Sequence, residues 1–139
     1  MKLLGLDLGT KTLGMAVSDP LEIIATPVGT IHFAERDLAF ALNETEKIIR
    51  EKGIQKIVLG LPKHMSGDVG TLGDYVYEFK KMLEDKLQLE VVLIDERLTS
   101  KLANQTMLLA DLSRQKRKTK VDKIAATFIL QTYLDMKKK

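Results

Sequence analysis

Residues 3–18 read LLGLDLGTKTLGMAVS, and this stretch decides the fold. Two apolar runs, 3–8 and 13–18, are joined by a polar link, Gly9-Thr10-Lys11-Thr12. A link this short favours an antiparallel hairpin. A third run, over about 25–31, contains Pro27 and Gly29, which are typical of an edge strand. The chain is therefore predicted to open with an antiparallel meander of three strands.

Helical and strand patterns alternate after the meander. Strands are expected over 56–61 and 90–94, and helices over about 36–52, 72–83, 100–112 and 121–136. The order βββαβαβαα predicts an α/β fold, a mixed five-stranded sheet flanked by helices. Residues 1–139 then form one domain, with ligands expected near the carboxyl ends of the strands.

Composition narrows the functional classes. The chain has no cysteine, which excludes a disulfide framework, thiol catalysis and a Cys-based zinc site. It shows neither a signal peptide nor an apolar stretch long enough to cross a bilayer, so we expect a cytoplasmic protein without a membrane partner. A net charge of +3 and a pI near 9.0 permit a nucleic-acid partner without requiring one.

Basic residues gather in one short segment, at Arg114, Lys116, Arg117, Lys118, Lys120 and Lys123. Candidates for holding backbone phosphates are Lys11, Lys63, Arg97, Arg114, Lys116, Arg117 and Lys118. Only 5% of residues are aromatic, which favours backbone recognition over base stacking. The basic tail over 137–139 is interpreted as a solvated end.

Asp7 interrupts an otherwise apolar strand. Alternation places it on the face opposite Leu4, Leu6 and Leu8. A carboxylate buried there is costly unless it is paired or binds a cation. Pairing with a lysine or with turn amides would explain a carboxylate at this position. Binding of a metal ion would explain it equally well.

Asp95-Glu96-Arg97 follows the apolar run 91–94, where that strand should end. Adjacent strand residues point to opposite faces, so only one of the two acids can share the face of Asp7. One interpretation is that this acid belongs to the same site as Asp7. The alternative is that the tripeptide is only a polar exit from the strand.

Asp122 is expected in the first turn of the last helix, where the helix dipole favours a negative charge. It also borders the apolar stripe that includes Ala125, Ala126 and Ile129, so it can point inward. Three carboxylates that converge over a sheet form an oxygen cage suited to Mg²⁺ or Mn²⁺. The sequence leaves the number of ions open.

Four motifs in this order together resemble the YqgF family, also called RuvX. They are Gly5-Leu6-Asp7-Leu8-Gly9-Thr10-Lys11, Leu59-Gly60-Leu61-Pro62, Asp95-Glu96-Arg97-Leu98-Thr99-Ser100 and Val121-Asp122-Lys123-Ile124-Ala125-Ala126. The resemblance spans nearly the whole chain and implies a ribonuclease H-like fold related to the RuvC resolvases.

The resemblance implies a metal-dependent nuclease that matures the 5′ end of pre-16S ribosomal RNA, or resolves Holliday junctions in the older assignment. The family's acids map onto Asp7, Glu96 and Asp122. The motif at 59–62 contains no acid, although many ribonuclease H-like proteins carry one at the end of this strand. The loop 63–68, with His64, and Thr12 also depart from the family's usual residues.

Other interpretations remain open at the level of sequence. The segment Asp7-Leu8-Gly9-Thr10 also resembles the phosphate loop of actin-like ATPases, although the chain is too short for their two domains. A non-catalytic RNA-binding factor in ribosome assembly is the more serious alternative. Structured RNA and branched DNA are both acceptable partners, and the chain can act as a monomer or a homodimer.

Overall fold

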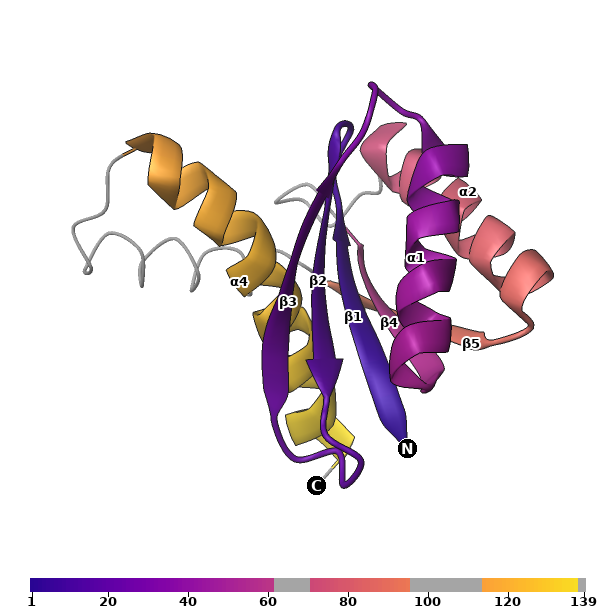
Figure 1. Cartoon of the computed structure of the whole chain (residues 1–139), viewed down its shortest axis with the longest axis vertical. Helices are drawn as coiled ribbons and strands as arrows, with labels where there is room; N and C mark the ends of the chain where they lie inside the picture. Colours follow the sequence, from indigo (N-terminus) through magenta and orange to yellow (C-terminus); the bar gives the residue numbers. More distant parts are fainter. Residues whose placement is uncertain (62–70, 96–113, 138–139) are drawn as a thin grey trace.

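The computed structural model describes residues 1–61, 71–95 and 114–137 (Figure 1). Its strands are β1 (Lys2–Leu8), β2 (Thr12–Ser18), β3 (Ala25–His32), β4 (Ile54–Leu61) and β5 (Glu90–Asp95). Its helices are α1 (Leu38–Lys52), α2 (Thr71–Leu87) and α4 (Arg114–Lys137). The helix predicted over 100–112 lies outside the described residues.

The strands form one mixed sheet in the order β3-β2-β1-β4-β5. β1 pairs antiparallel with β2, which pairs antiparallel with β3, and β1, β4 and β5 run parallel. This arrangement confirms the predicted meander and the mixed sheet, and it places β3 at an edge. The carboxyl ends of β1, β4 and β5 therefore lie side by side at one end of the sheet, which we call its carboxyl edge. A ligand is expected there.

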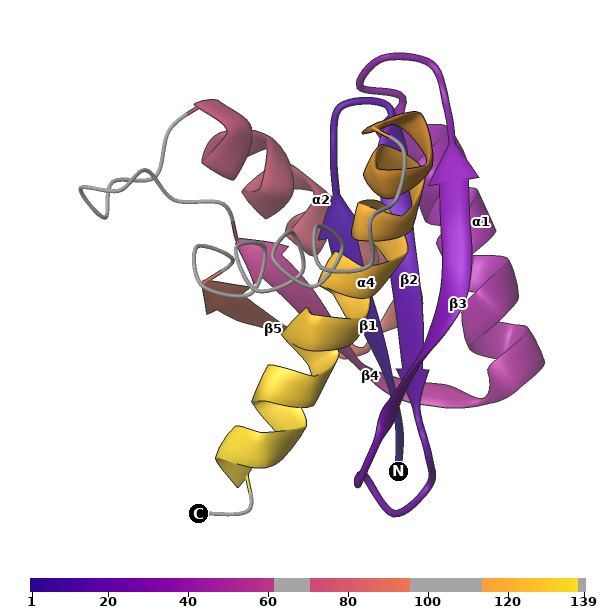
Figure 2. The same cartoon turned by 90° about the vertical axis from the view of Figure 1, so that its left-hand side faces the viewer.

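Helices cover both faces of the sheet. α1 and α2 lie on one face, and α4 crosses the other (Figures 1 and 2). Leu4, Leu6 and Leu8 of β1 belong to the apolar cluster under α1 and α2, whereas Leu3 packs with residues of α4. The alternation read from the sequence thus separates two cores, one on each face.

Gly5 allows α4 to approach the sheet closely. A Cβ atom at this position would lie 2.7 Å from Cβ of Leu130 and 3.0 Å from the carbonyl oxygen of Ala126. The first contact is shorter than real Cβ atoms show and the second is tight, so a side chain here would require α4 to shift and β1 favours a glycine. Ala126 and Leu130 are themselves fully buried against the sheet.

The boundaries of α1 follow from its end residues. The carboxylate of Asp37 accepts a hydrogen bond from the backbone N–H of Phe40 at 3.2 Å, so the helix begins at Leu38, slightly later than predicted. Gly53 ends it in the left-handed conformation, as predicted. None of the helices in the described segments has the length and apolar content needed to cross a membrane.

α4 begins at Arg114, and the prediction of a start at Val121 was wrong. The segment before Val121 is rich in Arg, Lys and Gln, which are good helix formers, and it contains neither Gly nor Pro. The sequence placed the start where the apolar stripe begins, because only the part of the helix that packs on the sheet carries that stripe.

Asp19 organises the turn between β2 and β3. Its carboxylate accepts hydrogen bonds from the backbone N–H groups of Ile24 at 2.8 Å, Ile23 at 2.7 Å and Leu21 at 3.1 Å. These bonds, that of Ile24 first, lower the pKa of Asp19 below its ordinary value of 3.8. A carboxylate with a lowered pKa in the folded state stabilises the fold above the unfolded pKa, and that contribution is lost as the pH falls through the folded pKa.

We therefore expect Asp19→Asn to reduce the loss of unfolding free energy that the wild type shows below about pH 4. Urea denaturation of both proteins at neutral pH and at about pH 3 measures this difference. An equal acid-induced loss in the two proteins would contradict the assignment to Asp19.

Candidate active site

Asp7 lies near the carboxyl end of β1, in the middle of the sheet, and is half-buried. In β2 it pairs with Gly14. In β4, Leu59 pairs with Leu6, so the next residue along that strand, Gly60, lies beside Asp7. The carboxylate-bearing residue is thus flanked by glycines on both neighbouring strands.

These residues also share a face of the sheet. Asp7 alternates with Leu6 and Leu8, which pack under α1 and α2, so it lies on the face covered by α4, as Gly5 does. Gly60 follows the same rule, because Val58 belongs to the cluster under α4. On this face, therefore, neither neighbouring strand places a side chain directly beside Asp7.

α4 brings a second acidic position toward this region. The helix runs opposite to β1, so its last turns lie at the end of the sheet where β1 begins (Figures 1 and 2). Ala126 packs on Gly5, and Asp122 precedes Ala126 by four residues, about one helical turn. Asp122 is therefore offset from Ala126 toward the carboxyl end of β1. Asp7 is offset from Gly5 in the same direction.

Asp122 does not lie in the first turn of its helix, contrary to the sequence prediction, because α4 already begins at Arg114. A favourable interaction with the helix dipole, which acts over the first turn, therefore does not explain this residue. The structure describes its backbone, and its side chain lies outside the described part of the chain.

Asp95 is the last residue of β5 and pairs with Leu61. Val91 belongs to the cluster under α1 and α2, and Ile94 to the cluster under α4, so alternation assigns Asp95 to the face opposite Asp7. Glu96 lies outside the described residues. Within residues 1–61, 71–95 and 114–137, no three acidic or histidine side chains form a metal-binding group.

The predicted phosphate-binding cations are only partly described. Lys11 is exposed in the turn between β1 and β2, which follows Asp7. Lys63 and Arg97 lie outside the described residues. The backbone of Arg114, Lys116, Arg117 and Lys118 belongs to the first turns of α4, and their side chains are not among those described.

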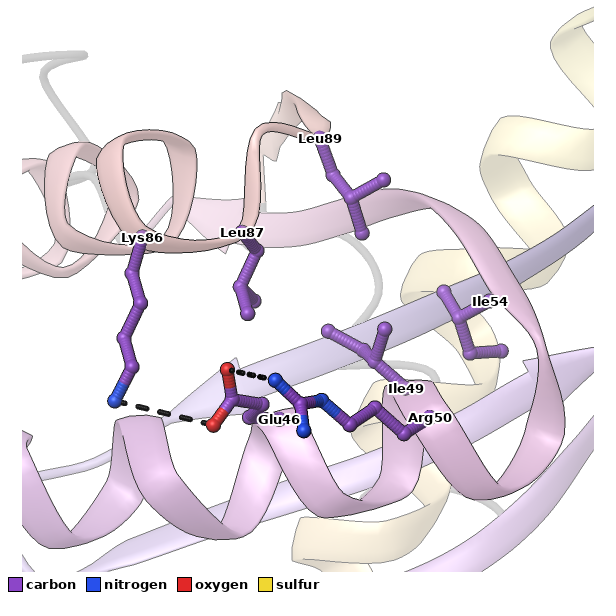
Figure 3. A pocket seen from close by; sticks show the side chains of 7 residues that line it. All are labelled: Glu46, Ile49, Arg50, Ile54, Lys86, Leu87 and Leu89. Atoms are coloured by element: carbon purple, nitrogen blue, oxygen red, sulfur yellow. Dashed lines mark hydrogen bonds and ion pairs between the residues drawn. The ribbon is translucent and has the colours of Figure 1, made fainter.

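A cavity of about 220 Å³ between α1 and α2 lies far from Asp7 in the fold. Ile54 and Leu89, at the amino ends of β4 and β5, contribute to its lining, so it is at the opposite end of the sheet. Figure 3 shows the carboxylate of Glu46 between two cations, Arg50 at 3.3 Å and Lys86 at 3.9 Å. Its one carboxylate is already paired with both cations, and the cavity lies at the end of the sheet opposite Asp7, so it is not the candidate active site.

Sequence reasoning missed Gly14 and Gly60 as parts of the site. Gly60 was noted in a motif, but only for the acid that the motif lacks. A detectable signal was a glycine inside each predicted strand, which often marks the close approach of a ligand or another backbone. The position of these glycines beside Asp7 follows only from the register of the sheet.

Solved structures with the same fold include two resolvases bound to DNA junctions. RuvC of Thermus thermophilus in complex with a Holliday junction substrate matches with a TM-score of 0.60 and 12% identity, over 98% of this chain and 96% of RuvC. The fowlpox virus resolvase with Holliday junction DNA matches with a TM-score of 0.57 and 13% identity, over 100% of both chains. These similarities confirm the predicted ribonuclease H-like fold.

Curated relatives are much closer in sequence. A protein of Clostridium botulinum (strain Eklund 17B / Type B) is 49% identical over 135 residues, 97% of each chain. A protein of Bacillus subtilis (strain 168) is 48% identical over 135 residues, 97% of this chain and 98% of the relative. Both are named as pre-16S rRNA nucleases.

A family model described as "RuvX: Holliday junction resolvase" matches residues 1–136. The match covers all four motifs on which the resemblance was based. It agrees with the similarity of the curated relatives over nearly their full length. The chain therefore belongs to the RuvX family.

Proposed function

We propose that this chain is a metal-dependent nuclease that hydrolyses phosphodiester bonds in the precursor of 16S ribosomal RNA, at its 5′ end. The observation that carries the proposal is the position of Asp7 at the carboxyl edge of the parallel strands, between Gly14 and Gly60, on the face covered by α4. Its RuvX relatives, named as pre-16S rRNA nucleases, support the reaction and the substrate. Action in the cytoplasm is part of this proposal.

Asp7, Glu96 and Asp122 are the proposed metal ligands and catalytic acids. Alternation in β5 supports Glu96 over Asp95, because Asp95 lies on the face opposite Asp7. The position of Asp122, one turn before the contact between Ala126 and Gly5, supports its inclusion. Carboxylate oxygens are ligands that Mg²⁺ and Mn²⁺ accept, so this donor set fits either ion.

Asp7, Glu96 and Asp122 would hold a divalent ion, which would supply activation of a water molecule and stabilisation of the departing oxygen. The protein's own residues position the substrate around it. Gly14 and Gly60 leave room beside Asp7 for a phosphate group. Lys11 offers a cation at the same edge of the sheet, and Lys63, Arg97 and the basic first turns of α4 complete the proposed backbone-binding surface.

Gly60→Ala is expected to reduce cleavage about tenfold, since a methyl group beside Asp7 occupies space proposed for the phosphate and shifts it from its reactive position. Initial cleavage rates at saturating metal measure the effect. Thermal unfolding should show a folded variant, which separates loss of space from loss of structure. Wild-type activity in Gly60→Ala would contradict the proposed place of the phosphate.

Two substrates decide between the proposed function and its alternatives. Purified protein is incubated with precursor 16S RNA and with a four-way DNA junction, each with Mg²⁺ or Mn²⁺, and the product ends are mapped. Cleavage at the 5′ end of the RNA is the expected result. The description of the family model favours the junction as the second candidate, and symmetric paired cuts in it would indicate a homodimer. Binding of RNA without cleavage of either substrate would instead indicate a non-catalytic assembly factor.

A further inference from the structure

The turn between β1 and β2 is held from outside through three successive carbonyl groups. The hydroxyl of Tyr75 donates a hydrogen bond to the carbonyl of Gly9 at 3.2 Å. The backbone N–H of Arg36 donates to the carbonyl of Thr10 at 2.6 Å, and that of Phe33 to the carbonyl of Lys11 at 2.9 Å. All three donors come from outside the turn, namely from the start of α2 and from the segment between β3 and α1.

Fixed carbonyls also fix the amide groups of the turn. In a trans peptide unit, the C=O of one residue and the N–H of the next lie in one plane and point in opposite directions. The N–H groups of Thr10 and Lys11 therefore point away from the donors Tyr75 and Arg36. In the described part of the chain, no acceptor is found for either group.

Tyr75 is built to hold this arrangement. Its ring is buried, with 4% of the residue exposed, and the guanidinium of Arg36 lies 5.1 Å from the ring centroid. Burial raises the pKa of Tyr75, so its hydroxyl stays protonated and can donate at neutral pH. Arg36 itself has a left-handed backbone, with φ of 59°, which is unusual for a long side chain.

The strained backbone of Arg36 coincides with two contacts that hold the turn between β1 and β2. The same residue that adopts the left-handed conformation donates the 2.6 Å hydrogen bond to Thr10 and stacks on Tyr75. Strain of this kind persists only where the surrounding contacts impose it, and it is frequent next to functional sites. The contacts of Arg36 thus add to those of Tyr75 in setting the orientation of the turn.

We propose that this turn binds a phosphate of the nucleic acid through the backbone N–H groups of Thr10 and Lys11, and that Tyr75 is the positioning residue that orients them. The inference rests on the proposed nuclease function. Successive backbone N–H groups in a turn form a concave site for anions, and the exposed side chain of Lys11 adds a positive charge.

The contacted phosphate is a neighbour of the cleaved one. Thr10 follows Asp7 by three residues, which corresponds to about 10 Å in an extended chain. Phosphates of one strand are spaced by about 3.4 Å along the axis of duplex DNA, and the axial spacing is a lower bound on the distance between neighbouring phosphates. The turn therefore holds the strand within about three nucleotides of the reacting bond and contributes to substrate binding.

Amide NMR spectra of the full chain, titrated with a short RNA hairpin in metal-free buffer, test this inference. The Thr10 and Lys11 amide signals of the wild type should shift in a saturable manner. Tyr75→Phe keeps the ring under Arg36 and removes only the hydroxyl, so RNA affinity should fall about fivefold and the two shifts should become smaller. In cleavage assays KM should rise while kcat stays within about twofold.

Tyr77→Phe is the matched control, because Tyr77 is on the same helix and 44% exposed. It should bind RNA as the wild type does. If the wild type binds RNA with unchanged Thr10 and Lys11 amide signals, or if Tyr75→Phe binds as tightly as the wild type, the inference is wrong and the nuclease function is unaffected. Absence of RNA binding by the wild type would overturn the proposed function as well. If Tyr75→Phe does not fold, the shifts of the Thr10 and Lys11 amide signals in the wild type decide whether the turn binds the phosphate.

Discussion

Asp7→Asn is expected to reduce metal-dependent cleavage on the order of a thousandfold, the size of effect that follows removal of one essential group from a catalytic site. Asparagine keeps the shape of the side chain and removes its charge, so it no longer balances the charge of a divalent ion. Gly14 and Gly60 carry no side chain that could take over this role in the neighbouring strands. Single-turnover cleavage with saturating Mg²⁺ or Mn²⁺ measures the loss.

Asp95→Asn is the control that makes this prediction specific. Asp95 is a carboxylate at the same edge of the sheet, but alternation assigns it to the face under α1 and α2. The Asp95→Asn variant should retain most of the cleavage activity. Glu96→Gln should lose as much cleavage activity as Asp7→Asn does. If Asp7→Asn cleaves like the wild type, the proposed metal site is wrong. RNA binding by Asp7→Asn should persist, because binding depends mainly on cations.

Much of the fold could be predicted because its determinants are local. The polar link 9–12 fixes the hairpin, and Pro27 with Gly29 marks β3 as an edge strand. Gly53 ends α1 through its left-handed backbone, which a side chain disfavours. The face of Asp7 also follows from local alternation. Each of these features depends on a few consecutive residues and on nothing far away in the chain.

The parts that were missed depend on contacts between distant segments. Gly60 gains its place beside Asp7 through the pairing of β1 with β4, which no local pattern encodes. Tyr75 falls within the helix predicted over 72–83, but its hydroxyl reaches Gly9 only because the start of α2 lies beside the turn after β1. The early start of α4 was missed because helix propensity, without an apolar stripe, leaves a weak signal.

Gly5→Ala has the second largest expected effect, because the new methyl group would lie 2.7 Å from Cβ of Leu130 and 3.0 Å from the carbonyl oxygen of Ala126. Neither atom is the end of a flexible side chain, so a rotamer change cannot relieve the contact and α4 must move. Overpacking of this kind costs about 1–3 kcal/mol of unfolding free energy. Urea denaturation measures that cost.

The same displacement should affect cleavage more than stability. α4 carries Asp122 one turn before its contact with Gly5, so a helix pushed off the sheet takes this proposed metal ligand away from Asp7. A misplacement of about 1 Å costs on the order of a hundredfold in rate. Phe79→Leu is the matched control, since Phe79 of α2 is fully buried against the opposite face of the sheet. If it loses comparable stability and keeps its cleavage rate, the loss in Gly5→Ala comes from the position of α4. Equal loss of cleavage in both variants would mean that the rate depends on global stability and that the placement of Asp122 by Gly5 is not required.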